Sequence, residues 1–260
     1  MTQINAFHEQ VVLITAAGSG LGRGIAIDLA MRGASVYVWD RDASALQDLT
    51  ECAKTKNIKI TTRVVDLVSE REVESAFKAT LSQSKKIDVL INNAGGSLHT
   101  PFHFLKQSKE DWDRVFNLNL MLTVQLTQLV IPHMLERQYG RIINLGSKAG
   151  RYGSLFAGAN YVAVKGAIHA LTLQLAQEFG PQGITCNAIC PGAVMTPRVQ
   201  GLLKERQSDE QRQKILNEIP VRRHGELEDI ANSVAFLASP ESGFITGVLL
   251  DVNGGQAMST

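Results

Sequence analysis

The chain of 260 residues is long for one ordinary domain and short for two, which favours a single large α/β unit. Its 26 Lys and Arg against 25 Asp and Glu leave a formal net charge of +1, so a surface that coats nucleic acid is not expected. The three cysteines, Cys52, Cys186 and Cys190, show no metal-ligand spacing, which favours a reducing cytoplasm. Residues 1–10 hold no basic stretch followed by an apolar one, so we expect no signal peptide.

Apolar runs of strand length alternate with helical stretches along most of the chain. They occupy residues 11–16, 35–40, 58–66, 87–93, 141–147, 183–192 and 247–252. Strands this apolar, separated by helices, predict a parallel sheet that is covered on both faces. No internal repeat or linker interrupts the pattern. We therefore predict one α/β domain over residues 1–260, a doubly wound sheet of seven parallel strands.

Three helical stretches carry further expectations. Residues 118–132 are uncharged but too short to cross a membrane, so a buried helix and no membrane partner are expected. The helices at 115–135 and 161–179 lack the polar stripe of a helix that packs one face on a sheet, which predicts contact with another subunit. The polar stretch 198–218 is either a solvated helix pair or a mobile lid, near residues 196–219, beside a ligand site.

The first strand runs into a glycine-rich loop, TAAGSGLGRG, that begins at Thr15. Small residues let the backbone approach a pyrophosphate at a helix N-terminus, although Arg23 breaks the strict G-x-G-x-x-G pattern and a tight turn is the alternative. Asp40 closes the second strand, where a carboxylate accepts hydrogen bonds from the adenosine ribose and repels a 2′-phosphate. NAD is therefore favoured over NADP, with Arg41 offsetting part of the repulsion.

Polar or small residues also end the next two strands. Asp66 ends the third, and Asn92-Asn93-Ala94-Gly95 ends the fourth. Ligands of open α/β sheets bind outside the carboxyl ends of the strands, so these ends fit a dinucleotide laid across them. Taken alone, Asn-Asn-Ala-Gly is as well explained by a turn.

The strongest chemical pattern combines a tyrosine, a lysine and a serine. Tyr161 and Lys165 are spaced i, i+4 and share one helix face, and Ser147 ends the fifth strand. A phenol has an unperturbed pKa of about 10, and a nearby ammonium favours its ionised form. A serine hydroxyl can hold a substrate carbonyl oxygen beside that phenol. Tyr-x-x-x-Lys alone is a weak signal, but its order after the glycine loop, Asn-Asn-Ala-Gly and Ser147 is specific.

With these motifs in this order, the chain resembles the short-chain dehydrogenase/reductase family of the common length, over about residues 11–255. The resemblance implies an extended Rossmann fold and hydride transfer to or from a nicotinamide cofactor, without a metal. It implies a catalytic tetrad of Asn119, Ser147, Tyr161 and Lys165. In it Tyr161 is the acid/base, Lys165 holds the nicotinamide ribose and lowers the pKa of the phenol, Ser147 positions the substrate oxygen, and Asn119 supports a relay water. The cofactor-binding residues that it implies are Thr15, Gly18, Ser19, Gly20, Leu21, Asp40, Arg41, Asp66, Leu67, Asn93, Ala94, Gly95, Tyr161, Lys165, Pro191, Gly192, Val194 and Thr196.

The chain departs from the family pattern in two places. Ala16 stands where the motif has its first glycine, so the loop shifts slightly if that position needs an unusual dihedral angle. The spacing from Ser147 to Tyr161 is one residue longer than expected, which places an extra residue within 151–158. For the tetrad asparagine, Asn117 is the less favoured alternative to Asn119.

Other residues near the expected pocket carry weaker hypotheses. A plain loop role is favoured over substrate contact for His99 and His103, and a packed or interface position over ligand binding for His169. For Lys148, Arg151 and Arg198, a solvated side chain is favoured over a cationic wall that would bind an anionic substrate.

The leading functional hypothesis is an NAD-dependent alcohol dehydrogenase or carbonyl reductase in the cytoplasm, acting on a small alcohol or ketone. A 3-oxoacyl thioester reductase of the same family and a non-catalytic nucleotide-sensing protein remain alternatives. A methyltransferase would not explain Ser147, Tyr161 and Lys165 together, and the absence of G-x-x-x-x-G-K-[ST] excludes a P-loop NTPase. The family resemblance also implies a homotetramer with two-fold interfaces.

Overall fold

The structure is a computed structural model that describes residues 6–154, 157–196, 199, 201 and 208–258. Its seven strands form one parallel sheet in the order β3-β2-β1-β4-β5-β6-β7. They are β1 (Val11–Thr15), β2 (Ser35–Asp40), β3 (Ile60–Val64), β4 (Val89–Asn92), β5 (Gly140–Leu145), β6 (Ile184–Pro191) and β7 (Leu249–Val252). The predicted doubly wound, seven-stranded sheet is therefore confirmed.

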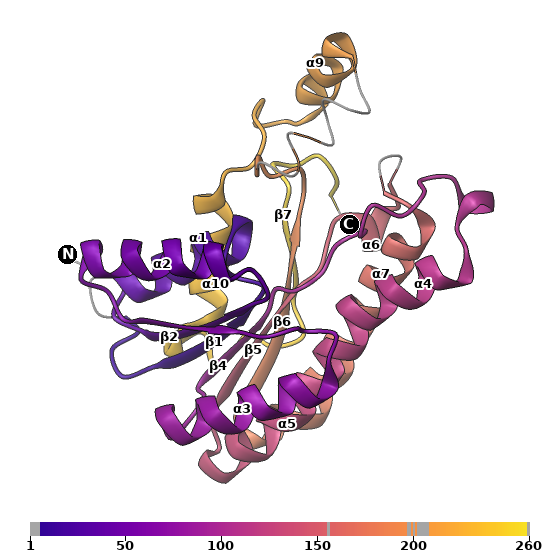
Figure 1. The fold of residues 1–260 in the computed structure, drawn as a ribbon. Helices are drawn as coiled ribbons and strands as arrows, with labels where there is room; N and C mark the ends of the chain where they lie inside the picture. Colours follow the sequence, from indigo (N-terminus) through magenta and orange to yellow (C-terminus); the bar gives the residue numbers. More distant parts are fainter. Residues whose placement is uncertain (1–5, 155–156, 197–198, 200, 202–207, 259–260) are drawn as a thin grey trace.

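Helices cover both faces of this sheet, as Figure 1 shows. One layer is α1 (Gly20–Met31), α2 (Ala43–Lys56) and α10 (Leu227–Ala238); the other is α3 (Glu70–Ser84), α5 (Leu122–Arg137) and α7 (Ala159–Phe179). Each layer buries its own apolar cluster against the strands, around Ile25 and Leu49 on one face and around Phe77 and Leu126 on the other. Each such fully buried side chain contributes about 1.5–3 kcal/mol to folding.

The helix that contains residues 118–132 is longer than the sequence predicted. Helix α4 (Lys109–Phe116), a π-helical turn η2 (Asn117–Met121) and α5 follow one another without a break, giving a helix of 29 residues. Length and composition alone would let it cross a membrane, since its most apolar stretch has a mean hydropathy of 1.3. That stretch is 44% buried inside the fold. We interpret it as a core helix, because α5 packs beside α3 against the sheet.

The sheet has its switch point between β1 and β4. The chain runs outward from β1 to β3 and then returns to the other side of β1, so the connections leaving β1 and β4 diverge. Such a divergence opens a crevice at the carboxyl ends of the strands, where doubly wound folds bind their ligands. The site residues predicted at strand ends therefore come together at this crevice.

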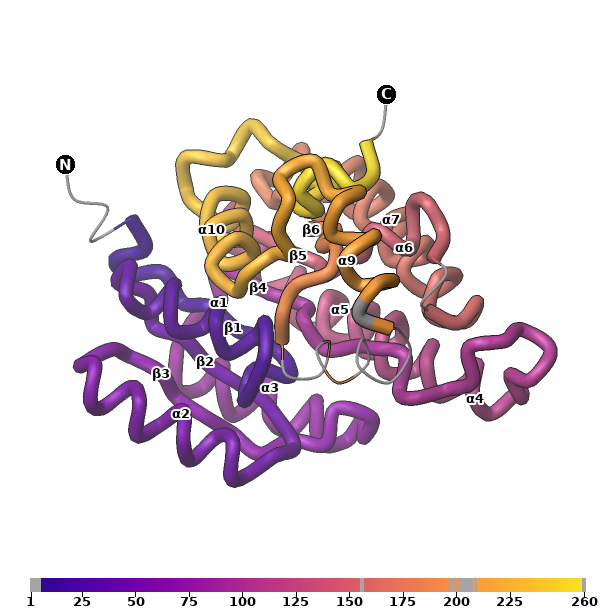
Figure 2. Tube along the Cα trace, turned by 90° about the horizontal axis from the view of Figure 1, so that it is seen from above, coloured from indigo at the N-terminus to yellow at the C-terminus, as the bar shows by residue number. Residues whose placement is uncertain are grey.

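A polar helix, α9 (Asp209–Glu218), forms within the expected lid segment, residues 196–219. It begins with a capping box in which Ser208 and Gln211 bond reciprocally to each other's backbone N–H. Figure 1 shows α9 beyond the end of the sheet, apart from the two helix layers, and Figure 2 shows it from above. Arg198 and residues 202–207 of this segment lie outside the described residues. The short helices of the described chain are η1 (Phe104–Lys106), α6 (Ala149–Tyr152), η3 (Gly180–Gln182) and η4 (Pro240–Ser242).

Candidate active site

The ends of β1 and β4 are joined through Thr15. Its buried hydroxyl oxygen accepts the backbone N–H groups of Asn93 and Ala94, at 3.1 and 3.0 Å. The Asn93 amide in turn donates to the carbonyls of Thr15 and Ala16, each at 2.9 Å. A Cβ on Gly22 would lie only 2.5 Å from that amide nitrogen, so the start of α1 can approach β4 this closely only as glycine. These contacts fix the glycine-rich loop at the switch point.

Asp40 lies directly beside this loop. Its Oδ2 accepts the Gly18 N–H at 2.9 Å, and its Oδ1 accepts the Asp42 N–H at 3.1 Å. Backbone donors thus hold the carboxylate at the end of β2 with both oxygens oriented. Arg41 is exposed next to it.

Ala16, which replaces the first glycine of the motif, has a φ of +51°. This is the left-handed region, where a Cβ is crowded by the backbone and costs ~1–2 kcal/mol. The position does need an unusual dihedral angle, and alanine adopts it here with the surrounding hydrogen bonds intact.

We expect Ala16→Gly to stabilise the protein by about 1 kcal/mol or less, because the lost steric cost exceeds the added freedom of the unfolded chain. Thermal unfolding should then shift upward by roughly 2 °C. Ala17→Gly is the control, since Ala17 is buried and has no positive φ, and it should lower the melting temperature. Equal effects of both substitutions would contradict the strain at Ala16.

The remaining predicted cofactor residues lie around the same crevice. Thr196 is buried, and its methyl would be 3.9 Å from a Cβ on Gly20, so the loop after β6 faces the loop after β1. The loop after β6 is held by a hydrogen bond from the Gly192 N–H to the Val252 carbonyl at 3.0 Å. Asp66 is exposed at the end of β3, and its carboxylate accepts the Val68 N–H. The other predicted members of this group lie in the same loops: Ser19, Leu21, Leu67, Pro191 and Val194.

Asn119 is buried in the π-helical turn, whereas Asn117 is exposed. The Oδ1 of Asn119 accepts the Gly96 N–H, and its Nδ2 donates to the Gly96 carbonyl, both at 3.0 Å. Nδ2 also donates to the Val115 carbonyl at 2.8 Å. Such π-turns often occur at functional sites. The structure therefore favours Asn119 over Asn117 for the tetrad position.

Gly95 lies between Asn119 and Lys165. A Cβ on Gly95 would come within 2.4 Å of the Asn119 Oδ1 and 3.2 Å of the Lys165 Nζ. The glycine at the end of Asn-Asn-Ala-Gly thus lets two of the tetrad side chains meet at one point.

Lys165 is 3% exposed, and its ammonium donates to the Leu145 carbonyl at 2.6 Å. The same ammonium lies 5.7 Å from the centre of the Tyr161 ring, which is half-buried one helical turn earlier on α7. A buried ammonium is costly unless polar groups surround it. The site supplies such groups at a place where a phenol is also within electrostatic reach.

Ser147 follows β5, two residues after the carbonyl that holds Lys165. Its Oγ accepts the Ala149 N–H at 3.1 Å. In this bond the hydroxyl acts as the acceptor, so its hydrogen is left to be donated to another oxygen. The fifth strand therefore carries a hydrogen-bond donor into the same crevice.

A buried asparagine that the sequence analysis missed adjoins Tyr161. Asn160 is fully buried, and its Oδ1 accepts the Tyr161 N–H at 2.8 Å and a donor of the Gln107 amide at 3.2 Å. Its own N–H donates to the Gln107 Oε1 at 3.3 Å. These hydrogen bonds fix the start of α7 to the segment before α4. The only signal in the sequence was a polar residue inside an apolar helix, directly before Tyr161.

Arg151 does not line a cationic wall, the less favoured alternative for this residue. Its guanidinium donates to the Asp251 carboxylate at 2.9 Å and to the Leu249 carbonyl at 2.8 Å, which ties α6 to β7. Lys148 is half-buried; burial lowers the pKa of its ammonium, and nearby Glu218 of α9 opposes that shift. His99 and His103 are exposed. Only Lys148 remains as a described candidate for contact with a substrate anion.

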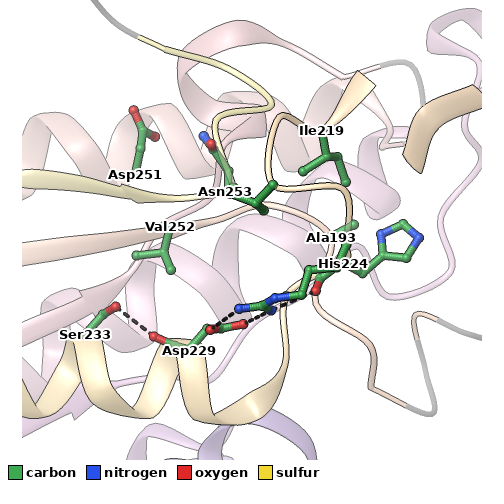
Figure 3. A pocket seen from close by; sticks show the side chains of 12 residues that line it. Ala193, Ile219, His224, Asp229, Ser233, Asp251, Val252 and Asn253 are labelled. Atoms are coloured by element: carbon green, nitrogen blue, oxygen red, sulfur yellow. Dashed lines mark hydrogen bonds and ion pairs between the residues drawn. The ribbon is translucent and has the colours of Figure 1, made fainter. Parts of the chain in front are cut away.

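A hollow of about 330 Å³ lies between the loop after β6 and the start of α10 (Figure 3). The Arg223–Asp229 ion pair at 2.6 Å crosses it, and this partner lowers the pKa of Asp229 to about 2. The tetrad residues are not among those lining it. The buried Ile219 lines it at the end of α9, so the hollow marks the base of the lid segment.

Comparisons with known proteins agree over nearly the full chain. A family model described as Enoyl-(Acyl carrier protein) reductase matches residues 15–257. A 2,3-dihydroxy-2,3-dihydro-p-cumate dehydrogenase of Pseudomonas putida is 38% identical over 96% of this chain and 95% of its own length. The 3-oxoacyl-[acyl-carrier-protein] reductase FabG of Staphylococcus epidermidis is 38% identical over 95% of this chain and 98% of its own. The crystal structure of a 3-oxoacyl-[acyl-carrier protein] reductase from Brucella melitensis superposes with a TM-score of 0.89 at 30% identity, covering 99% of this chain and 95% of that one.

Proposed function

The chain belongs to the short-chain dehydrogenase/reductase family and is an oxidoreductase, and we propose that it interconverts a secondary alcohol and a ketone with NAD. The observation that carries this proposal is the meeting of Asn119 and Lys165 at Gly95, with the Tyr161 ring beside the same ammonium. This meeting lies at the switch point of the sheet, where a dinucleotide is expected.

The residues at the crevice fit a nicotinamide dinucleotide. The glycine-rich loop opens α1, whose first N–H groups offer an anion site, and Gly22 leaves no room for a side chain there. The Asp40 carboxylate stands where it would hold the adenosine ribose, and Lys165 would hold the nicotinamide ribose. When bound, the cofactor supplies the hydride acceptor or donor.

The chain's own groups handle the proton and the substrate oxygen. During oxidation the Tyr161 phenolate accepts the hydroxyl proton of the alcohol and becomes a phenol, and during reduction the phenol returns this proton to the substrate oxygen. The Ser147 hydroxyl donates its hydrogen to the substrate oxygen and orients it, while the hydroxyl oxygen accepts the Ala149 N–H. The Lys165 ammonium stabilises negative charge on the phenol oxygen. Asn119 fixes Gly96 through paired hydrogen bonds and supports the relay of protons past Lys165.

The substrate class can be tested with compounds that the relatives suggest. A cyclic cis-dihydrodiol represents the cumate-type dehydrogenase, and a 3-hydroxyacyl thioester with its 3-oxo form represents FabG. Reduced-nicotinamide absorbance should change with at least one member of a panel that also contains simple secondary alcohols and ketones. Preference for the 3-oxoacyl thioester would establish the alternative reductase. Tight cofactor binding without turnover of any member would instead support the nucleotide-sensing protein.

We expect kcat/KM to be higher with NAD than with NADP. The Asp40 carboxylate, held by two backbone N–H groups, would meet the 2′-phosphate with like charge. Asp40→Asn removes the charge and keeps one acceptor oxygen. The ratio of kcat/KM for NAD to kcat/KM for NADP should therefore fall by roughly tenfold, or about 1.4 kcal/mol.

Arg41→Ala is the matched control for this preference. Arg41 is exposed beside Asp40 and would attract the phosphate, so its removal should move the ratio further toward NAD. A clear preference of the wild-type protein for NADP would overturn the assignment.

We also propose a homo-oligomer, a tetramer by family resemblance, in the cytoplasm. The outer side of α7 presents exposed small residues, Ala163 and Ala170, and the exposed apolar Leu173. Met121, in the turn η2 that packs beside α7, is also exposed. A hollow of about 510 Å³ lies beside the first turn of α7, between this turn, α4 and the segment that precedes α7. It is lined by Phe102, Trp112, Gly153, Ser154, Ala157, Ala159, Val162 and Ala163.

Light scattering at micromolar concentration should therefore report more than one copy. Ala170→Glu places a charge on this α7 surface and should dissociate the assembly. Ser75→Glu, at an exposed position of α3 on another side of the molecule, should leave it intact. A monomeric wild-type protein would refute the proposed assembly.

A further inference from the structure

His169 continues the catalytic stripe of α7. Tyr161, Lys165 and His169 follow one another at intervals of four residues, so the three side chains share one helix face. His169 is only 5% exposed, and its Nε2 accepts the Ser147 N–H at 3.4 Å. The catalytic helix therefore contacts the predicted substrate-binding serine directly, through a group that the tetrad does not include.

The backbone N–H groups around Ser147 show what this contact does. Those of residues 146–149 donate in order to the Ile189 carbonyl, the His169 imidazole, the Pro191 carbonyl and the Ser147 hydroxyl. The first and third bonds attach the segment to β6. The N–H of Ser147 points the other way, toward α7, where the imidazole is the acceptor. Without the imidazole, the Ser147 N–H would lose its hydrogen-bond acceptor in a largely buried segment, which costs about 1–3 kcal/mol.

The segment also fits the ring closely. A Cβ on Gly146 would lie 2.5 Å from the His169 Nε2, and one on Gly150 would lie 2.9 Å from its Cε1. Glycines on both sides of Ser147 thus let the backbone wrap around the imidazole. The imidazole thus packs directly against the backbone on both sides of Ser147.

The surroundings of His169 keep it neutral. Burial, assisted by the positive charges of Lys165 on α7 and Arg151 on α6, lowers its pKa to about 4. From β6, the Cys190 Sγ lies 3.3 Å from Nε2, and burial raises the pKa of that thiol to about 12, so it brings no charge. Asp251 of β7 is paired with Arg151. Since Nε2 accepts the Ser147 N–H, the ring proton belongs on Nδ1.

We propose that His169 is a positioning residue, which as a neutral, Nδ1-protonated imidazole holds the Ser147 backbone so that the Ser147 hydroxyl faces the substrate oxygen. The proposal rests on the oxidoreductase function proposed above. Protonation of His169 would replace the acceptor by a donor and bring a second positive charge toward Lys165.

Two substitutions of His169 distinguish its role as a hydrogen-bond acceptor from its role in filling space. His169→Gln retains an oxygen that can accept the Ser147 N–H, whereas His169→Met fills the space with only a weak acceptor. With whichever panel compound the wild-type protein turns over, kcat should fall roughly tenfold or more in His169→Met and be largely restored in His169→Gln. The Kd for NAD should stay within about twofold in both, because neither change touches the cofactor loops.

A stability control excludes a general packing effect. Thr172 is fully buried on α7, and its hydroxyl accepts a hydrogen bond from Asn144 at 2.9 Å. Thr172→Val should lower the melting temperature while kcat is kept. Unchanged kcat in His169→Met, or equal losses in His169→Met and His169→Gln, would overturn the proposal.

A measurement on the wild-type protein needs no turnover and so separates this proposal from the proposed function. Nitrogen NMR shifts of His169 should report the neutral Nδ1–H tautomer from about pH 8 to pH 5, because its pKa lies near 4. The Ser147 amide should be protected from hydrogen exchange. An Nε2–H tautomer, or an imidazolium at neutral pH, would overturn the role of His169 even if the enzyme is active.

Discussion

Tyr161→Phe is expected to remove nearly all turnover while leaving the affinity for NAD almost unchanged. The ring stays, so its packing and its contact with the Lys165 ammonium, 5.7 Å from the ring centre, are kept. Only the oxygen that carries the proton is lost. General acid–base groups contribute ~10²–10⁴-fold, so kcat should fall by at least that order.

The decisive measurement pairs NAD titration with turnover for the wild-type and Tyr161→Phe proteins, after circular dichroism has shown both to be folded. Ser147→Ala should likewise impair turnover and spare cofactor binding, because the proposed role of Ser147 is to hold the substrate oxygen rather than the dinucleotide. If Tyr161→Phe keeps more than about a tenth of wild-type kcat, Tyr161 is not the acid–base residue. The nucleotide-sensing alternative would then need renewed attention.

The sheet could be predicted because buried parallel strands are continuous apolar runs. All seven occur close to the predicted positions, and β6 (Ile184–Pro191) illustrates why, since seven of its eight residues are buried. The helix at Lys109–Arg137 was harder to predict. Its charged first turns hide its beginning, and the π-turn at Asn117–Met121 depends on tertiary packing that no sequence period reveals.

The site could be predicted where it follows from strand ends and helix spacing. Parallel strands end at the same edge of the sheet, which is why Thr15 and Asn93 meet, and four-residue spacing brings Tyr161 and Lys165 together. Long-range side-chain partners could not be predicted in this way. Nothing in the sequence indicates that Arg151 pairs with Asp251, 100 positions later, because such a pair forms only once α6 has packed beside β7.

Lys165→Met should differ from Tyr161→Phe by weakening both turnover and NAD binding. The ammonium is 3% exposed, bonded to the Leu145 carbonyl and adjacent to Gly95 and Asn119, at the point where the nicotinamide ribose would lie. Methionine keeps the length but has no donor. A lost charged hydrogen bond costs about 1.5–3 kcal/mol, so NAD affinity should fall roughly tenfold or more, and kcat by at least as much.

Two controls distinguish the loss of the Lys165 contacts from unfolding and from a general loss of positive charge. Replacing a buried charge by an apolar side chain of similar size is often near neutral for stability, so the melting temperature of Lys165→Met should change little. Lys78→Met, at an exposed position of α3, removes the same charge and should leave both NAD affinity and kcat unaltered. A folded Lys165→Met protein with unchanged NAD affinity would show that Lys165 does not hold the cofactor, and only its effect on Tyr161 would remain.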